Sequence, residues 1–509
     1  MLARATAATP WGIEAQPVQI EVDVHNGLPQ IQIVGLPDAS VRESRERVQR
    51  ALKNCGFDLS PKSIVVNLAP ADLRKEGNHL DLAIALALLG AYGQISEENL
   101  NGRLFCGELG LDGTVRSVRG GLAVADLAAR MGLSEVILPA ANGPEAAALG
   151  GIPVFGVAHL VEAIDHALGS APLVAASPRE VLFSTAAKKR PDLSDVRGQT
   201  GAKRALEIAA AGGHNLLFLG PPGSGKTMLA RRLPGLLPQL ALAEAIEVTK
   251  IWSLAAEEPP AGLVLERPFR SPHTGTSTVG MIGGGPSPRP GEASLAHNGV
   301  LFLDELPEFR RDTLEALRQP LEEGLVSVVR ARARFTFPAR FALLAAMNPC
   351  PCGHLGDPRY DCRCPPPMVE RYRGRVSGPL LDRIDLHVEV PAVSLKELRG
   401  TSGETTADVA ARIGRAREQQ AARFGPESPS PINAAMNTQE LRRFCTTTTE
   451  GRALLEAAFE RLGLSARALD RVLKVSRTIA DLDGGGPIQP VHLAEAIQYR
   501  SLDRRMARG

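Results

Sequence analysis

One glycine-rich segment constrains the fold of this chain more than any other part of the sequence. Residues 220–227 read GPPGSGKT and match the phosphate-binding pattern G-x-x-x-x-G-K-[ST] at every position. The segment follows the apolar run Asn215 to Leu219 and precedes a predicted helix that begins at Lys226. Backbone N–H groups of such a loop face phosphate oxygens, and we expect Lys226 to reach the β- and γ-phosphates and Thr227 to ligate Mg²⁺. The predicted nucleotide-binding residues are Gly220, Pro221, Pro222, Gly223, Ser224, Gly225, Lys226 and Thr227.

Two further apolar runs end in side chains that a nucleotide hydrolase needs. Asp304 and Glu305 follow the run Val300 to Leu303, and Asn348 follows the run from Phe341 onward. Short apolar runs of this kind are typical of a buried parallel sheet, so the fold class predicted here is α/β. We expect Asp304 to hold Mg²⁺, Glu305 to polarise the attacking water and Asn348 to orient that water.

Composition excludes several classes of protein. The 58 Lys and Arg against 56 Asp and Glu give a net charge of +2, so the surface is not a uniformly basic nucleic-acid coat. At 4% aromatic residues, ring stacking is not the main recognition device. No window reaches the roughly 18 uninterrupted apolar residues of a membrane span, and residues 1–10 do not resemble a secretory signal. We therefore expect a cytoplasmic protein with no membrane partner.

The order of predicted elements divides the chain into four parts. At roughly 150 residues per domain, 509 residues predict about three domains. Residues 1–170 mix strands and helices, 171–191 read as a linker, 192–392 as an α/β core and 393–509 as a helical lid. The last helices are predicted over Thr449 to Leu462, Ser465 to Ala480 and Pro490 to Tyr499.

Near the N-terminus, two alternating runs predict neighbouring strands. Val18 to Val24 and Gln30 to Val34 alternate apolar and polar residues. Asn26-Gly27 between them is typical of a hairpin turn. We expect these two strands to form a hairpin.

Together these motifs resemble the AAA+ ATPases, in particular the magnesium-chelatase-like branch and its competence protein ComM/YifB family. The likeness extends from one end of the chain to the other. It implies an ATP-dependent DNA branch-migration helicase. In addition to the phosphate loop, the segments that carry the resemblance are GLPQIQIVGLPD (27–38), VNLAPADLRKEG (66–77), SLAHNGVLFLDELPE (294–308), AAMNPCPCG (345–353), SGPLLDRIDLHVEV (377–390) and EAIQYRSLDR (495–504).

The resemblance also implies roles for single residues. Arg383, in the segment LLDR, resembles the arginine finger that acts on the neighbouring subunit's ATP, and Arg467, in LSAR, resembles sensor 2. A finger supplied in trans neutralises charge in the phosphoryl-transfer transition state, which implies a homo-oligomeric ring, expected to be a hexamer. The other matching positions are Lys226 and Thr227 in Walker A, Asp304 and Glu305 in Walker B, and Asn348 as sensor 1.

Residues 1–170 resemble the proteolytic domain of Lon-type proteases. The segment KEGNHLD (75–81) lies where that family has its nucleophilic serine, and residues 107–122 match the stretch before its catalytic lysine. Here the serine position is His79 and the lysine position is Ala123. A Ser–Lys pair works only when both partners are present, so we expect this fold to serve interaction or assembly and not proteolysis.

Four of the seven cysteines lie within a short segment after Asn348. Cys350, Cys352, Cys362 and Cys364 form the pattern C-x-C…C-x-C. Four thiolates in one loop predict a tetrahedral Zn²⁺ site, with His354 as a substitute ligand, against the alternative of unligated cysteines.

A basic hairpin is predicted between Asp304 and Asn348. Gly324 to Arg340 alternates like two paired strands, and Arg330, Arg332 and Arg334 are spaced by two, which predicts that they share one face. From Arg330 to Arg383 there are ten arginines against four acids, a local charge of +6. We expect sequence-nonspecific contact with a phosphate backbone, against the alternative of a solvated face.

The predicted function is an Mg²⁺-dependent ATPase that translocates on single-stranded or branched DNA. The resemblance implies recombination or natural-transformation intermediates as its substrates. The alternative is the ATPase subunit of a magnesium-chelatase-type complex. The basic hairpin and the cysteine loop favour DNA.

Overall fold

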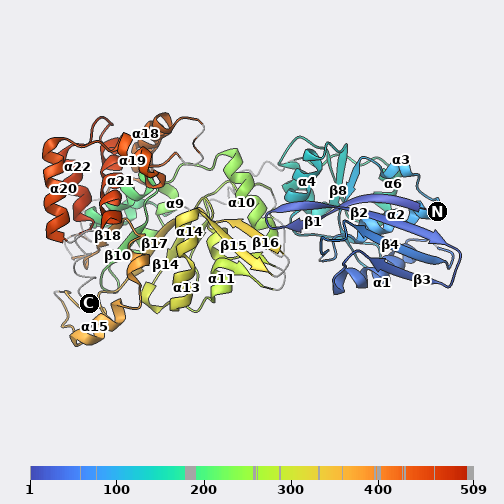
Figure 1. Ribbon diagram of the computed structural model, residues 1–509, viewed down its shortest axis with the longest axis horizontal. Helices are drawn as coiled ribbons and strands as arrows, with labels where there is room; N and C mark the ends of the chain where they lie inside the picture. Colours follow the sequence, from blue (N-terminus) through green and yellow to red (C-terminus); the bar gives the residue numbers. More distant parts are fainter. Residues whose placement is uncertain are drawn as a thin grey trace.

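The computed structural model shows two lobes joined end to end (Figure 1). The N-terminal lobe lies at one end, and the C-terminal helices lie at the other end beyond the second sheet. Within the described residues, no helix is both long enough and apolar enough to cross a membrane. The structure describes residues 2–57, 59–75, 77–177, 191–255, 260, 262–285, 288–330, 333–357, 359–394, 397, 403–426, 428, 431–462 and 465–500.

A seven-stranded mixed sheet organises the N-terminal lobe, in the order β3-β4-β2-β1-β5-β8-β9. Its core surrounds α2, whose residues are all buried, because an Ala- and Leu-rich helix has no polar face to turn to water. The strands of this lobe, of which β6 and β7 form a separate two-stranded sheet, are β1 (Leu2–Trp11), β2 (Glu14–His25), β3 (Gln30–Val34), β4 (Ser63–Ala69), β5 (Arg103–Phe105), β6 (Glu108–Leu109), β7 (Val115–Arg116), β8 (Glu135–Pro139) and β9 (Val154–Val157). The helices are α1 (Ala39–Asn54), α2 (Asp81–Ala91), α3 (Glu97–Leu100), α4 (Gly121–Arg130), α5 (Gly143–Ala147) and α6 (Leu160–Leu168).

The predicted hairpin between β2 and β3 is wrong, although both strands exist. The strand β4 lies between them, antiparallel to β2 and parallel to β3. Residues 26–29 cross the start of β4, where a Cβ on Gly27 would lie 3.0 Å from the Cβ of Ser63. Four residues span the roughly 10 Å across one intervening strand, so the turn signal did not determine which strands pair.

The second lobe is built on a five-stranded parallel sheet in the order β11-β14-β17-β10-β18. Apolar cores cover both faces, which explains the uninterrupted apolar strands. The strands of this lobe are β10 (Leu216–Leu219), β11 (Phe269–Arg270), β12 (Gly283–Gly284), β13 (Arg289–Pro290), β14 (Val300–Leu303), β15 (Leu325–Arg330), β16 (Ala333–Pro338), β17 (Ala342–Met347) and β18 (Leu386–Glu389). Its helices up to β18 are α7 (Thr200–Gly212), α8 (Lys226–Ala230), α9 (Leu233–Leu236), α10 (Leu242–Ala255), α11 (Thr278–Ile282), α12 (Glu292–Leu295), α13 (Arg311–Ala316), α14 (Arg318–Glu323), α15 (Pro366–Arg373) and α16 (Gly378–Leu381).

The C-terminal part is helical, as the sequence predicts. Its helices share one core with a face of the parallel sheet, so that Val475 and Phe218 belong to the same apolar cluster. The division of the chain at residue 392 therefore stays a prediction, and the predicted linker 171–191 lies largely outside the described residues. The helices are α18 (Thr406–Phe424), α19 (Thr438–Phe444), α20 (Thr449–Leu462), α21 (Ala466–Leu482) and α22 (Pro490–Gln498).

Contacts between the lobes run through α10 and the β15–β16 hairpin. Lys250 of α10 forms ion pairs with Asp126, at 2.9 Å, and with Glu14, at 3.3 Å. The ring of Trp11, at the end of β1, lies 4.7 Å from the ring of Phe335 in β16. The N-terminal sheet therefore contacts the predicted DNA-binding hairpin directly.

Candidate nucleotide-binding site

The phosphate loop lies at the carboxyl end of β10, the edge where parallel sheets bind ligands. Gly223 and Gly225 have φ values of +73° and +95°, and a Cβ on either would meet no atom within 4 Å. Gly220 has the opposite constraint, because its Cβ would lie 2.1 Å from the carbonyl oxygen of Val390. Glycine is thus required by backbone conformation at two positions and by close packing at the third.

Lys226 is buried inside the phosphate loop. Its Nζ donates hydrogen bonds to the carbonyl oxygens of Gly220 and Pro221, at 2.7 and 2.9 Å, and to Oδ1 of Asn348, at 3.2 Å. Burial lowers the pKa of Lys226, and the charges of Asp304 and Glu305 oppose that shift. The ammonium group is therefore partnered mainly by neutral oxygens and fits a nearby anion.

Ser224, in the same phosphate loop as Lys226, also fits a phosphate ligand. The Oγ of Ser224 is buried, and within the described part of the chain it has no hydrogen-bond partner. A buried hydroxyl without a partner is costly, and a phosphate oxygen would satisfy it.

The hydroxyl and carboxylate predicted to bind Mg²⁺ are in direct contact. Thr227 donates a hydrogen bond to Oδ2 of Asp304 at 2.7 Å. Both are oxygen donors at the carboxyl edge of the sheet, so they fit the small, hard Mg²⁺ ion. Glu305 follows with φ of +53°, and its side chain is exposed at the mouth of the site. Such a conformation in a residue other than glycine is costly and concentrates at functional sites.

Gln199 is a site residue that the sequence reasoning missed. Its side-chain amide donates hydrogen bonds to the carbonyl oxygens of Ser224, at 3.1 Å, and Pro391, at 2.7 Å. It therefore ties the phosphate loop to the segment after β18. Its φ of +54° is a feature of the folded backbone, and no sequence signal would have found it.

Arg383 and Arg467 lie near the amino ends of the parallel strands, whereas the phosphate loop lies at their carboxyl ends. Both line a cavity of about 980 Å³ beside Asn215, the residue that precedes β10. Asn215 donates a hydrogen bond to the carbonyl oxygen of Arg383 at 2.8 Å. The phosphate loop follows the other end of β10, so neither arginine belongs to the nucleotide site of its own chain.

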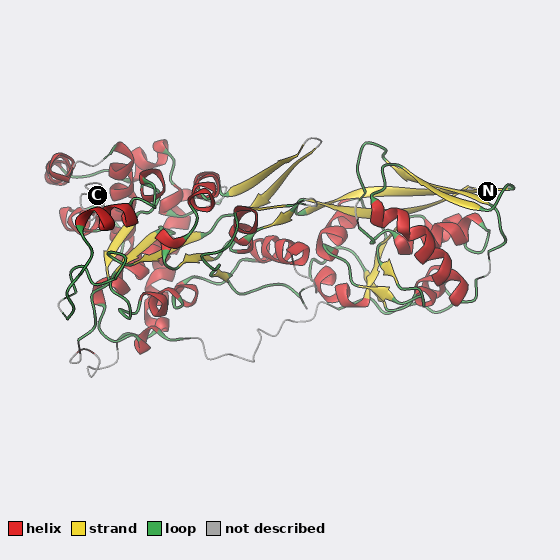
Figure 2. Cartoon of the chain, turned by 90° about the horizontal axis from the view of Figure 1, so that it is seen from below, coloured by secondary structure: helices red, strands yellow, loops and turns green. Residues whose placement is uncertain are grey.

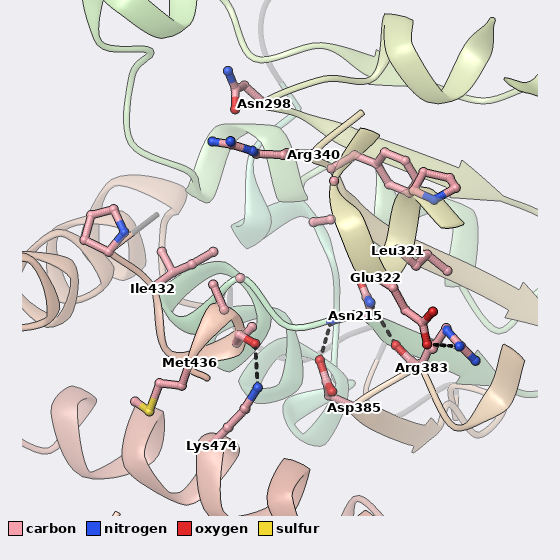
Figure 3. A pocket seen from close by; sticks show the side chains of 18 of the residues that line it. Asn215, Asn298, Leu321, Glu322, Arg340, Arg383, Asp385, Ile432, Met436 and Lys474 are labelled. Atoms are coloured by element: carbon pink, nitrogen blue, oxygen red, sulfur yellow. Dashed lines mark hydrogen bonds and ion pairs between the residues drawn. The ribbon is translucent and has the colours of Figure 1, made fainter. Parts of the chain in front are cut away.

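Several arginine side chains lie near Arg383 in the cavity, which acidic side chains also line. Burial and the like charges of Arg318, Arg467 and Arg471 lower the pKa of Arg383. Glu322, which the sequence reasoning also missed, forms an ion pair with it (Figure 3). Arg471 and Arg318 are themselves paired with Asp385 and Glu315, so the buried guanidinium of Arg383 lies within a network of ion pairs.

The basic hairpin projects from the body of the second lobe (Figure 2), and its described arginines lie on two different strands. Arg330 ends β15 and is paired with Ala333, whereas Arg334 belongs to β16 and is paired with Val329. Arg330 and Arg334 therefore belong to different strands and are not cross-strand partners, and the common face of the three arginines stays a prediction. Arg334 is on the exposed face and donates a hydrogen bond to Ser327. Arg332 lies outside the described residues.

The N-terminal positions that correspond to a Ser–Lys pair are both enclosed. His79 is buried, burial lowers its pKa to about 4, and Ala123 is buried in α4. A neutral imidazole and a methyl group provide no nucleophile–base pair there.

The cysteine loop lies against the phosphate loop. Gly353 packs on Pro222, and the sulfur atoms of Cys350, Cys352, Cys362 and Cys364 all lie within 4.8 Å of one another. His354, the predicted substitute ligand, packs with its ring tilted against that of Tyr360, the two ring centroids 4.9 Å apart. The four thiols are therefore brought together as the sequence predicts.

Comparison with known proteins accounts for nearly the whole chain. The family described as "Magnesium chelatase, subunit ChlI" matches residues 192–398, "Subunit ChlI of Mg-chelatase" matches 20–142, and "Magnesium chelatase, subunit ChlI C-terminal" matches 403–500. Competence protein ComM of Haemophilus influenzae is 46% identical over 507 residues, which cover 99% of this chain and 98% of that protein. The chain belongs to the ComM/YifB family of magnesium-chelatase-like proteins.

Other relatives extend this picture. Uncharacterized protein YifB of Escherichia coli is 46% identical over 97% of this chain and 96% of its own length. DNA replication licensing factor mcm6 of Dictyostelium discoideum is 22% identical over 60% of this chain and 33% of its own length. Family membership makes the chain an AAA+ ATPase, and the family implies ATP and Mg²⁺ as its ligands.

Proposed function

We propose that this chain is an ATP-driven motor that translocates on single-stranded or branched DNA and migrates DNA branches during recombination or natural transformation. The observation that carries the proposal is the juxtaposition of Lys226, Thr227, Asp304 and Asn348 at one edge of the sheet. The name of the Haemophilus influenzae relative associates it with competence. The weaker likeness to a replication licensing factor also favours DNA as the substrate.

The proposed chemistry divides among five side chains. Lys226 binds the β- and γ-phosphates, and Thr227 and Asp304 hold Mg²⁺, which supplies electrostatic stabilisation when bound. Glu305 polarises the attacking water. Asn348, whose Oδ1 accepts a hydrogen bond from Lys226, orients the same water. We propose that the contacts of Lys226 with loop carbonyls are exchanged for phosphate contacts when nucleotide binds.

Hydrolysis requires a second subunit in this proposal. Arg383 and Arg467 share a cavity at the sheet edge away from their own phosphate loop, so their target is the nucleotide of a neighbouring chain. We propose that these guanidinium groups bind the phosphate groups of that nucleotide. We propose a closed ring, expected to be a hexamer, in which each nucleotide site is completed by its neighbour.

Three further assignments belong to the same proposal. The N-terminal lobe has a Lon-like fold used for assembly, since it contacts both α10 and the hairpin. The compartment is the cytoplasm, where DNA and ATP are found. Zn²⁺, the third predicted cofactor, would not contact the nucleotide itself, because the four cysteines lie beside the phosphate loop and not in it.

ATP turnover with and without DNA tests the proposed function. We expect single-stranded and forked DNA to raise the rate, and a fluorescent four-way junction to be resolved only when ATP is hydrolysed. A magnesium-chelatase subunit would instead respond to porphyrin-binding partner subunits. Stimulation by such subunits without any response to DNA would replace the DNA motor by the chelatase alternative, which the family descriptions favour.

Replacing Arg330, Arg332 and Arg334 together by alanine tests the hairpin. We expect weaker DNA binding and a salt dependence whose log–log slope is flatter by up to about three units, because each lost phosphate contact releases one counterion fewer. Basal ATPase activity is expected to survive, since the hairpin lies away from the phosphate loop. Fluorescence anisotropy across a salt series measures both quantities.

Three exposed arginines on the C-terminal helices serve as the control set for that variant. Arg442 and Arg443 lie on α19 and Arg452 lies on α20, and all three are exposed. Their triple alanine variant removes the same net charge from another surface. Equal losses of DNA affinity in the two variants would show a diffuse charge effect and contradict a role for the hairpin.

A further inference from the structure

Four thiols converge in the loop between β17 and α15. The Sγ atoms of Cys350 and Cys352 are 3.4 Å apart, those of Cys350 and Cys362 are 3.6 Å apart, and those of Cys352 and Cys362 are 3.7 Å apart. A tetrahedral ion with metal–sulfur bonds of about 2.3 Å separates its ligands by about 3.8 Å. The sulfur atoms of Cys350, Cys352 and Cys362 therefore already have the spacing of ligands to one tetrahedral ion, and that of Cys364 lies within 4.8 Å of each of them.

The donor set and its spacing select the type of metal. Four thiolates in a tetrahedron are typical of zinc or iron. All four sulfur atoms lie within 4.8 Å of one another, which leaves room for a single ion and not for a cluster that places its own iron and sulfide between them. All four cysteines are free, so disulfide bonds do not account for their proximity.

Within its described residues, the surrounding loop has no apolar core of its own. Its large apolar side chains, Leu355 and Tyr360, are 40% and 59% exposed. A long irregular loop without such a core needs some other source of order, which a bound metal ion would supply.

The same loop is held between two parts of the nucleotide site. A Cβ on Gly353 would lie 2.5 Å from Cδ of Pro222, so the loop packs closely on the phosphate loop. Asn348, which contacts Lys226, precedes Cys350 by two residues. The carbonyl oxygen of the intervening Pro349 accepts hydrogen bonds from Arg373 at 3.0 and 3.1 Å. Order in the cysteine loop is thus transmitted to both Asn348 and the phosphate loop.

We infer that Cys350, Cys352, Cys362 and Cys364 bind one structural Zn²⁺ ion, which holds Asn348 and Pro222 in position for nucleotide hydrolysis. The binding of zinc stands on its own geometry. The effect on hydrolysis rests on the proposed ATPase function. Zinc content and ATP turnover therefore test separate parts of the inference.

Metal analysis of the full-length reduced protein tests the ion itself. We expect one zinc per chain, loss of that zinc in the double variant Cys362→Ser, Cys364→Ser, and retention of it in Cys55→Ser, which replaces a partly exposed cysteine outside the loop. Exchange of wild-type protein with Co²⁺ is expected to give the visible absorption of a tetrahedral tetrathiolate, and this readout needs no variant to fold. A metal-replete protein without zinc, or with iron in its place, would overturn the assignment.

The positioning role is tested by two glycines of the same loop. Gly353 and Gly356 have φ values of +82° and +81°, so alanine strains the backbone equally at both. A Cβ at 353 would strike Pro222, whereas a Cβ at 356 would meet no atom within 4 Å. We expect Gly353→Ala to keep its zinc but lower kcat for ATP at least tenfold, and Gly356→Ala to hydrolyse ATP within about twofold of wild type.

The remaining outcomes separate the two parts of the inference. Equal rates for the two alanine variants, or full ATPase activity after zinc removal, would overturn the positioning role. If the wild-type protein hydrolyses no ATP at all, the proposed function fails while the zinc stoichiometry still stands or falls by metal analysis.

Discussion

Replacing Arg383 by alanine is expected to lower ATP turnover by about 10³–10⁵-fold while changing nucleotide affinity little. The guanidinium lies at the edge of the sheet opposite its own phosphate loop, so its loss leaves that loop intact. Steady-state ATPase assays and binding of a fluorescent ATP analogue measure the two quantities. Arg383→Lys is expected to recover only part of the rate, because an ammonium group lacks the planar fork of donors.

Mixing experiments determine whether the arginine acts between subunits. Arg383→Ala and Lys226→Ala protein are each expected to be inactive alone, and mixed rings are expected to regain activity, because each supplies the half-site that the other lacks. Arg310→Ala is the control, since Arg310 is exposed and pairs only locally with Asp312. Mixed rings that form but hydrolyse no ATP would contradict a nucleotide site shared between neighbours.

Replacing Glu305 by glutamine is expected to leave ATP binding intact and slow hydrolysis by about 10²–10⁴-fold, the contribution of a positioned general base. The amide preserves the shape of the side chain but neither polarises water nor accepts its proton. Because ATP then stays bound, we also expect the variant to remain assembled as a ring in the presence of ATP. Size-exclusion chromatography with light scattering measures this oligomeric state.

Glu308→Gln is the matched control for that variant. Glu308 lies three residues further along the same turn, is about half exposed and pairs with Arg375 at 2.8 Å. The charge of Glu305 raises the pKa of Lys226 against the effect of burial, whereas Glu308 is paired with Arg375. A wild-type rate for Glu305→Gln, or an equal loss in both variants, would reassign the group that activates water.

Much of the nucleotide site could be predicted because local sequence determined it. The phosphate loop needs Gly223 and Gly225 for their backbone conformation, so its ability to bind phosphate depends on residues that are consecutive in the sequence. Asp304 and Asn348 could be placed because each ends an apolar run, and parallel strands bring their carboxyl ends to one edge. The contact between Thr227 and Asp304 follows from that rule alone.

Other features depended on strand pairing, which local patterns do not encode. Asn26-Gly27 predicted a hairpin, but β4 is inserted between β2 and β3 because its apolar residues pair with both. Arg330 and Arg334 were predicted to lie along one strand, but they belong to the two paired strands β15 and β16, so their spacing in sequence does not describe a single strand. A shift of turn position by one or two residues changes which face every later residue occupies.

By itself, the sequence determined the chemistry of this protein: a phosphate loop, its carboxylates and four thiols, because each is a short pattern with one physical use. Only the tertiary structure decided where that chemistry is placed. It separated Arg383 from its own phosphate loop, buried Gln199 against that loop and seated Gly353 on Pro222. These contacts join residues far apart in the chain, and their formation depends on the packing of whole sheets and helices.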